Sequence, residues 1–103
     1  MSKTLKHIYT KLNENTVINF WSADILTLID TYFDAGKITQ KPVKAVDGLK
    51  ETYTTVFKDQ ASFDEFLDEG ASNANLNSLQ TFCDENEVKY SIEVDGVVGE
   101  ANG

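Results

Sequence analysis

Carboxylate side chains are the groups whose type and spacing most suggest chemistry, because they gather in two short segments. The seven residues are Asp64, Glu65, Asp68, Glu69, Asp84, Glu85 and Glu87. Two pairs in the first segment lie four residues apart, and each such like-charge pair destabilises an isolated helix by about 0.2 to 0.5 kcal/mol. Stability alone would not select these pairs. We therefore predict an acidic surface that docks a basic protein partner; the alternative is a solvated helix face.

Ligands for metals and groups for nucleophilic catalysis are scarce in this sequence. His7 is the only histidine and Cys83 the only cysteine, so a multi-histidine metal site and an intrachain disulfide are excluded. The sequence has no G-x-S-x-G, G-x-x-x-x-G-K-[ST] or G-x-G-x-x-G motif. We expect no catalytic residues, no metal and no cofactor, and we interpret His7 as an ordinary strand residue.

Charge divides the chain into two unequal parts. Residues 1–58 hold eight lysines and six acids, a net charge of +2, whereas residues 59–103 hold one lysine and eleven acids, a net charge of −10. The total of −8 disfavours direct binding to nucleic acid or anionic membranes, whose phosphate groups are repelled. Nine lysines, no arginine and eight asparagines suit an accessory protein from a phage or another AT-rich genome.

Hydropathy places no part of the chain in a membrane. No apolar run approaches the roughly 18 residues that a membrane span needs. The N-terminal residues also lack the apolar stretch of a signal peptide. With a single cysteine, the sequence therefore predicts a cytoplasmic protein.

Alternating apolar and polar residues predict four strands. These strands cover residues 5–12, 37–46, 49–58 and 88–95. Asp47 and Gly48 predict a tight hairpin turn between the second and the third strand. Residues 16–21 either form a further short strand or lead into a helix.

Apolar residues spaced three and four apart predict the helices. The clearest helix has Ser22 as its N-cap and Gly36 at its C-terminus. A second helix begins at Asp59 or Ser62, and a polar linker at residues 71–75 separates it from a further helical stripe. The predicted helical segments are therefore 22–36, 59–70 and 76–83.

The order strand, helix, strand, strand, helix, strand predicts an α+β fold. We expect a two-layer sandwich of the ferredoxin-like βαββαβ type, with an antiparallel sheet and the helices on one face. Residues 1–95 should form a single domain, followed by a flexible C-terminal tail at residues 96–103.

One face of such a sheet is not covered by helices. This open face carries His7, Tyr9 and Lys11 or the residues that alternate with them, and large residues occur at both parities of the strands. An exposed apolar sheet face usually marks an interaction site. We therefore expect a homodimer through the sheet, unless residues 16–21 cover it.

Residues 57–63, FKDQASF, are the predicted junction between a strand and a helix. With this junction, the order of the predicted elements resembles that of dimeric ferredoxin-like proteins of the antibiotic-biosynthesis-monooxygenase type. The resemblance covers the topology of most of the chain and no specific motif. It implies paired sheets that enclose a small-molecule pocket, and it assigns no site residue.

Two functions remain in view. The first is a small acidic protein-binding or structural accessory module without a catalytic centre, which acts through the acidic helix face or the open sheet face. The alternative is a small-molecule-binding protein or a cofactor-free monooxygenase-type enzyme. Its pocket would be enclosed by the sheet and lined by His7, Tyr9, Tyr53 or Trp21.

Overall fold

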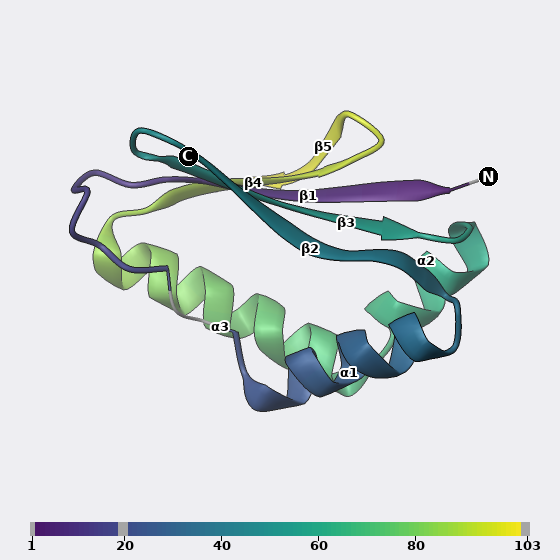
Figure 1. Cartoon of the computed structure of the whole chain (residues 1–103). Helices are drawn as coiled ribbons and strands as arrows, with labels where there is room; N and C mark the ends of the chain where they lie inside the picture. The colour runs from purple at the N-terminus through teal and green to yellow at the C-terminus, as the bar shows by residue number, and fades with distance from the viewer. Residues whose placement is uncertain (1, 19–20, 102–103) are drawn as a thin grey trace.

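The computed structural model describes residues 2–18 and 21–101, and arranges them in two layers (Figure 1). One layer is an antiparallel five-stranded sheet, and three helices cover one of its faces. In chain order the elements are β1 (Lys3–Thr10), α1 (Ala23–Asp34), β2 (Ile38–Asp47), β3 (Lys50–Phe57), α2 (Gln60–Leu67), α3 (Gly70–Asn86), β4 (Lys89–Val94) and β5 (Val97–Ala101). The predicted α+β class with an antiparallel sheet and helices on one face is confirmed. None of the helices in the described ranges is long and apolar enough to cross a membrane.

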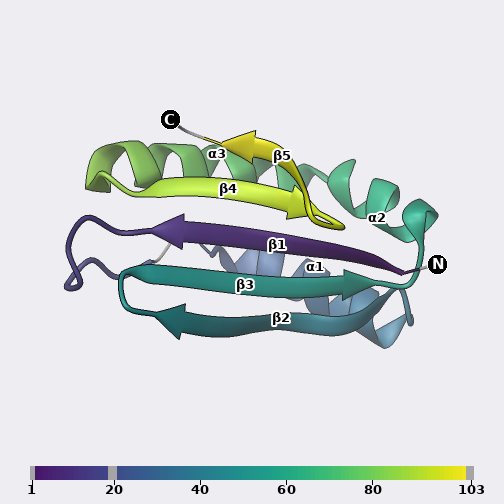
Figure 2. The ribbon, with the colours of Figure 1, turned by 90° about the horizontal axis from the view of Figure 1, so that it is seen from above.

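The strands lie in the order β2-β3-β1-β4-β5, with β1 in the centre (Figure 2). The fifth strand corrects the prediction of a flexible tail, because residues 97–101 pair with β4. Asp95 and Gly96 have φ values of 52° and 86°, as a two-residue hairpin turn requires. The Asp95 carboxylate also accepts a hydrogen bond from the Thr4 amide at 2.9 Å and pairs with Lys3 at 3.0 Å. These contacts fix the turn against the start of β1.

Helix α1 begins and ends where the sequence predicts. The Ser22 hydroxyl accepts a hydrogen bond from the Ile25 amide at 3.2 Å, so Ser22 is the N-cap. Gly36 has a φ of 77°, and its amide donates to the Phe33 carbonyl at 3.0 Å. Only a residue that tolerates this left-handed conformation ends the helix cheaply, which is the property of glycine.

The second helical region differs from the prediction in its boundaries. Asp59 is the N-cap of α2, which ends at Leu67, and α3 starts at Gly70 and includes the expected linker at residues 71–75. The Ser72 hydroxyl fixes the junction between α2 and α3, because it donates at 2.7 Å to the Phe66 carbonyl at the end of α2. The same carbonyl accepts from the Glu69 amide at 3.2 Å, so two hydrogen bonds at Phe66 join the end of α2 to the start of α3.

The core lies between the sheet and the helices, in two clusters. The first cluster joins α1 and α2 to the sheet through Leu5, Ile25, Ile29, Tyr32, Ile38, Phe57, Phe63 and Phe66. The second joins α3 to the sheet through Tyr9, Ile18, Leu79, Cys83, Val88 and Tyr90. Trp21 packs against both clusters. Its position between them places it where the two halves of the helical layer meet.

The open face of the sheet carries the alternates of His7, Tyr9 and Lys11. Tyr9 is fully buried in the second cluster, and its neighbours in register, Tyr90 and Glu51, are buried too. The aromatic residues of the central strands thus share the parity that faces the helices. The open face carries polar pairs such as Lys6 with Thr54, and its large residues are aliphatic, such as Ile8 and Val56.

The described part of residues 16–21 leads toward α1 and does not cover the open face. Residues 19 and 20 lie outside the described residues, and no strand occurs at residues 16–18. Ile18 is buried in the second core cluster, on the helix side of the sheet. The proposed cover over the other face is therefore absent in the described part of this segment.

Candidate functional site

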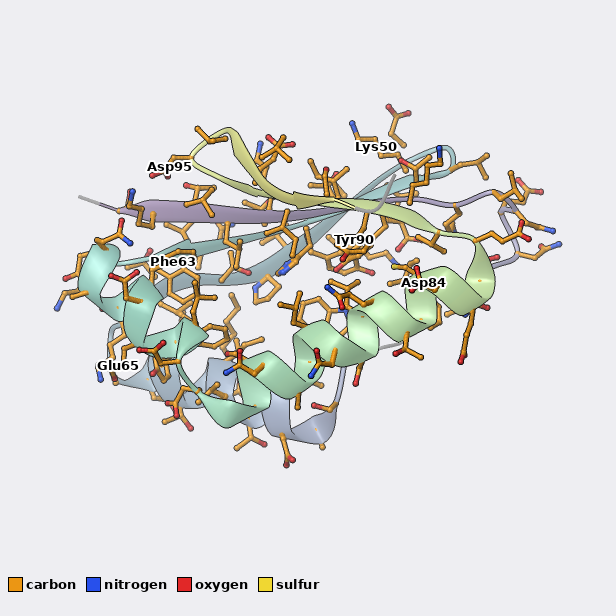
Figure 3. All side chains as sticks on the ribbon, turned by 180° about the vertical axis from the view of Figure 1, so that it is seen from behind. Lys50, Phe63, Glu65, Asp84, Tyr90 and Asp95 are labelled. Atoms are coloured by element: carbon orange, nitrogen blue, oxygen red, sulfur yellow. The ribbon has the colours of Figure 1, made fainter. Side chains whose placement is uncertain are left out.

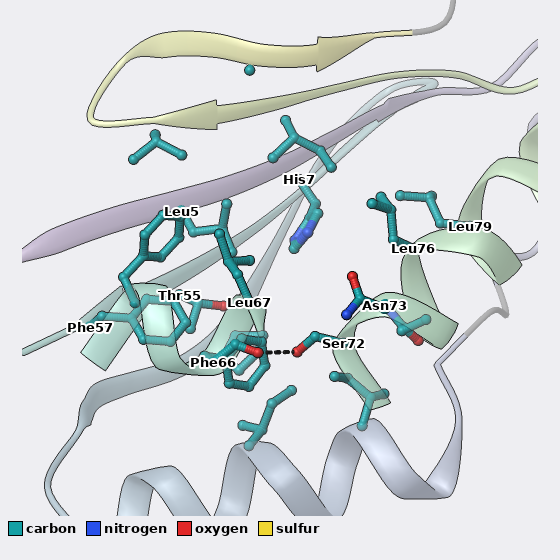
Figure 4. Close-up of a pocket in the computed structure, with 18 of the residues that line it drawn as sticks. Leu5, His7, Thr55, Phe57, Phe66, Leu67, Ser72, Asn73, Leu76 and Leu79 are labelled. Carbon is teal, nitrogen blue, oxygen red and sulfur yellow. Dashed lines mark hydrogen bonds between the residues drawn. The ribbon is translucent and has the colours of Figure 1, made fainter. Parts of the chain in front are cut away.

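A cavity of about 370 Å³ lies between the sheet and the helices (Figure 4). Every helix and every strand contributes to its wall. The lining residues are Leu5, His7, Trp21, Ile25, Ile29, Pro42, Thr55, Phe57, Phe63, Phe66, Leu67, Ser72, Asn73, Asn75, Leu76, Leu79, Ile92, Val94 and Gly99. Most of them are aliphatic or aromatic, and none carries a lysine, aspartate or glutamate side chain. This size and composition are typical of pockets for small molecules.

His7 is the titratable group in the wall of this cavity. Its position on β1 directs the ring away from the open face, and Figure 4 shows the imidazole pointing into the cavity. The ring stacks on Tyr9 at 6.3 Å between centroids and meets Trp21 edge-on at 5.9 Å. The Nδ1 atom is buried and has no hydrogen-bond partner among the described residues. Burial lowers the pKa of His7 from 6.5 to about 4, so the imidazole is uncharged at neutral pH.

Asn75 is the second polar side chain in the wall that lacks a partner. It lies on the buried stripe of α3 with only 9% of its surface exposed. No described residue donates a hydrogen bond to its Oδ1 atom. A buried polar atom left unpaired costs about 1 to 3 kcal/mol, so two such atoms in one cavity require an explanation.

The other polar groups of α3 near this cavity are already used by the fold. The Ser72 hydroxyl donates to Phe66, the bond drawn in Figure 4, and the Asn73 amide group donates to the Glu69 carbonyl at 3.3 Å. These two side chains therefore hold the junction of α2 and α3 in place. The unpaired atoms of His7 and Asn75, together with the hydroxyl of Thr55 on β3, are left as polar groups in the wall.

The cavity reaches the surface near the junction of α2 and α3. Leu67, at the end of α2, is 44% exposed although it lines the cavity. Asn73 on α3 and Gly99 on β5 also line it and are exposed. The wall of the cavity therefore includes surface residues of α2, α3 and β5.

Only part of the predicted pocket lining is found in this cavity. His7 and Trp21 line it, whereas Tyr9 and Tyr53 do not. Tyr9 is fully buried, and the Tyr53 hydroxyl donates to Glu51 at 3.0 Å. The sequence analysis did not identify Asn75. The available signal was its polar side chain on a stripe that includes Leu79 and Cys83, at helical spacing.

A buried ionic network lies elsewhere, at the turn end of β3. Glu51 is 5% exposed, and Lys11 approaches it at 2.9 Å and Lys44 at 3.6 Å. Burial alone would raise the pKa of Glu51. Hydrogen bonds from Lys11 and Tyr53, with both lysine charges, outweigh burial and lower the pKa below its ordinary value. We assign this network to the stability of the fold, because its members already pair with one another.

The two predicted like-charge pairs of the first acidic segment lie close together at the end of α2. Helix α2 ends at Leu67, but the Asp68 amide still donates to the Asp64 carbonyl at 3.2 Å, so these two residues stay one helical turn apart. The Tyr32 hydroxyl donates to Glu69 at 2.9 Å and to Glu65 at 3.3 Å, and Lys37 pairs with Glu65. A shared donor and a cation therefore reduce the repulsion between these two carboxylates.

The second acidic segment lies apart from the first, which also includes Asp64 and Asp68. Asp64 accepts from Gln60 at 2.7 Å and Asp68 is the C-cap of α2. Asp84, Glu85 and Glu87 lie at the far end of α3, whose 17 residues span about 25 Å. Figure 3 shows Glu65 and Asp84 at opposite ends of the helical layer. The structure thus divides the predicted docking residues into two acidic patches.

Neither a metal site nor a reactive thiol is found in the described parts of the chain. They contain no group of three or more His, Cys, Asp or Glu side chains placed to hold a metal ion. Cys83 is buried, and burial together with the charge of Asp84 raises its pKa to about 11. A thiol with this pKa is a poor nucleophile at neutral pH.

Comparison with protein-family models, curated proteins and solved structures finds no match for this chain. The resemblance to proteins of the monooxygenase type therefore stays a prediction. The functional argument depends on the chain's own geometry, and the cavity with its two unpaired polar groups is the feature that distinguishes it.

Proposed function

We propose that this protein binds a small, mainly apolar molecule in the cavity between the sheet and the helices. The observation that supports this is a cavity of about 370 Å³ without charged lining, into which the buried Nδ1 atom of His7 brings an unpaired polar group. Protein interiors contain few voids larger than a water molecule. Because stability alone does not favour such a void, a bound molecule is the simplest reason for it.

The topology is consistent with this proposal. We propose that the fold is ferredoxin-like in its first four strands, with β5 added at one edge. The order β2-β3-β1-β4, with α1 as one crossover and α2 with α3 as the other, supports this assignment. Two helical crossovers of unequal length leave the cavity between them and the sheet.

Protein docking is the second candidate function. The exposed residues Asp64 and Asp68 at one end of the helical layer, and Asp84 and Glu85 at the other, favour contact with a basic partner. A homodimer through the open face of the sheet is a further proposal. The threonine and lysine residues on that face make it less apolar than a stable dimer interface usually is.

Ethylbenzene is a suitable probe for the cavity, because it is apolar and small. We expect it to raise the melting temperature of the protein and to change the fluorescence of Trp21, the only tryptophan, which lines the cavity. Val94→Phe should weaken both effects, since Val94 lines the cavity and the larger side chain narrows it.

Val97→Phe is the matched control for this experiment. Val97 is 71% exposed and pairs with Val94 across the β4–β5 hairpin, but it does not line the cavity. The control should respond to ethylbenzene as the wild type does. If the wild type shows no response, or if Val94→Phe responds like Val97→Phe, the cavity is not a binding site.

A further inference from the structure

We infer that the ligand of this cavity is an uncharged molecule that carries a hydroxyl or N–H group, which donates a hydrogen bond to His7 or Asn75. This inference rests on the proposed function and specifies the chemical class of its ligand. It predicts weaker binding of pure hydrocarbons, which leave the polar groups unpaired, and it excludes anions. The argument has three steps: the charge of the wall, the hydrogen-bonding capacity of the two polar groups, and their placement in the fold.

The wall of the cavity offers no counter-ion to a charged ligand. None of its lining residues is lysine, aspartate or glutamate. Lys11 and Lys37 lie outside the wall, and each already pairs with a carboxylate. Lys11 pairs with Glu51, and Lys37 pairs with Glu65. A carboxylate or phosphate group would thus lose its hydration without gaining a cation. An uncharged molecule avoids that loss.

The two unpaired groups in the wall can both accept a hydrogen bond from the ligand. The Asn75 Oδ1 atom is an acceptor, buried and without a donor among the described residues. His7 is uncharged at neutral pH, because burial lowers its pKa to about 4, and the unpaired Nδ1 atom of an uncharged imidazole accepts a hydrogen bond in the tautomer that carries the proton on Nε2. A pure hydrocarbon would leave both acceptors unpaired in a desolvated site. A hydroxyl or N–H group would satisfy one of them.

The fold holds both groups on rigid elements that face the cavity. His7 is in the central strand, paired with Tyr53 on one side and Ile92 on the other. Asn75 is in the second turn of α3, whose start is held by the bond from Ser72 to Phe66. Polar groups fixed in this way on opposite walls orient a ligand between the layers, as specificity in small-molecule sites usually requires.

Three probes of nearly equal size test the inference: 4-ethylphenol, 4-ethylanisole and 4-ethylbenzoate. The phenol has a donor, the anisole replaces that donor with a methyl ether, and the benzoate is an anion at pH 7.4. Calorimetric titration of the wild type should give the tightest binding for the phenol. We expect binding at least about tenfold weaker for the anisole, the difference that one buried hydrogen bond produces, and none for the benzoate.

Variants of the two polar residues assign the acceptor. Asn75→Leu or His7→Phe should reduce the preference for phenol over anisole while binding of the anisole is kept. Asn77→Leu is the matched control, because Asn77 is exposed on the same helix and does not line the cavity. It should leave the preference unchanged. Far-UV circular dichroism of each variant checks that it is folded before it is titrated.

Different results overturn different parts of the proposal. If the anisole or the benzoate binds as tightly as the phenol, the cavity binds small molecules but the ligand class inferred here is wrong. If the preference for phenol survives in both Asn75→Leu and His7→Phe, the acceptor is assigned to the wrong residues. If none of the three probes nor ethylbenzene binds, the proposed function fails, and this inference with it.

Discussion

Protonation of His7 should destabilise the fold as the pH falls below neutral. Its pKa is 6.5 in an ordinary setting and about 4 in the folded protein, because the ring is buried. The unfolded chain therefore binds the proton more readily than the folded chain between these two values, and the free energy of unfolding decreases as the pH is lowered through this window. The full loss, complete below pH 4, is about 3 kcal/mol.

The measurement is best confined to pH 5 and above. Glu51, Asp59, Glu65 and Asp95 also have lowered pKa values, so their stabilisation is present above their ordinary pKa values of 4.5 and 3.8 and is lost only as the pH falls further. Between pH 7.5 and pH 5 the His7 contribution should fall by about 2 kcal/mol.

Urea unfolding followed by far-UV circular dichroism at four pH values in this range gives the assay. His7→Gln is the comparison, because glutamine is polar and does not titrate. We expect the wild type to lose about 2 kcal/mol between pH 7.5 and pH 5, while the variant stays nearly constant. An equal pH dependence in both proteins would refute the reasoning, and would mean that the imidazole is hydrated in the folded state.

Three further outcomes are expected. Lys11→Met should lower the free energy of unfolding at pH 7 by about 3 kcal/mol, because it leaves the buried Glu51 without its nearest cation. Chemical denaturation measures this loss. A loss below about 1 kcal/mol would show that the Glu51 carboxylate becomes hydrated instead. Tyr32→Phe should cost about 1 to 2 kcal/mol, since Glu65 and Glu69 lose their shared donor; an unchanged midpoint in urea would contradict that role. If the open sheet face pairs two copies, sedimentation velocity should report a dimer at micromolar concentration, and a strict monomer would reject the homodimer.

Features that depend on near neighbours in the sequence were predicted well. Helix α1 follows from apolar residues at helical spacing, from the Ser22 cap and from Gly36, all within one stretch of chain. Strand β4 follows from strict alternation at residues 88–95. Each of these signals is local, so no knowledge of the tertiary structure is needed to read it.

Strand β5 and the start of α3 were missed because their causes are not periodic. Residues 97–101 form an edge strand in which Val97 and Val98 are exposed, so no alternation of buried and exposed residues distinguishes them from a tail. The signal was the hairpin turn at Asp95 and Gly96. Helix α3 begins before its apolar stripe, where a contact between Ser72 and Phe66 sets the boundary.

The cavity could not be predicted from the sequence, because it is a space that side chains from all layers of the fold fail to fill. The residues around it, such as Ile29, Phe57 and Leu79, are ordinary core residues by type and spacing. Whether such residues meet or leave a gap depends on the separation of the helices from the sheet. Only the position of a polar residue on an apolar stripe, as at Asn75, indicates a site in advance.

His7 affects both the stability of the fold and the binding of a ligand. A ligand that donates to the uncharged imidazole binds the folded state alone, and at a concentration one hundred times its dissociation constant it adds about 2.7 kcal/mol to the free energy of unfolding. That gain is close to the loss of about 2 kcal/mol that His7 protonation should cause between pH 7.5 and pH 5. The folded protein keeps its imidazole uncharged throughout this range, since the pKa is about 4. Ligand affinity should therefore change little with pH where stability changes most, so a saturating ligand should offset the acid destabilisation of the empty protein.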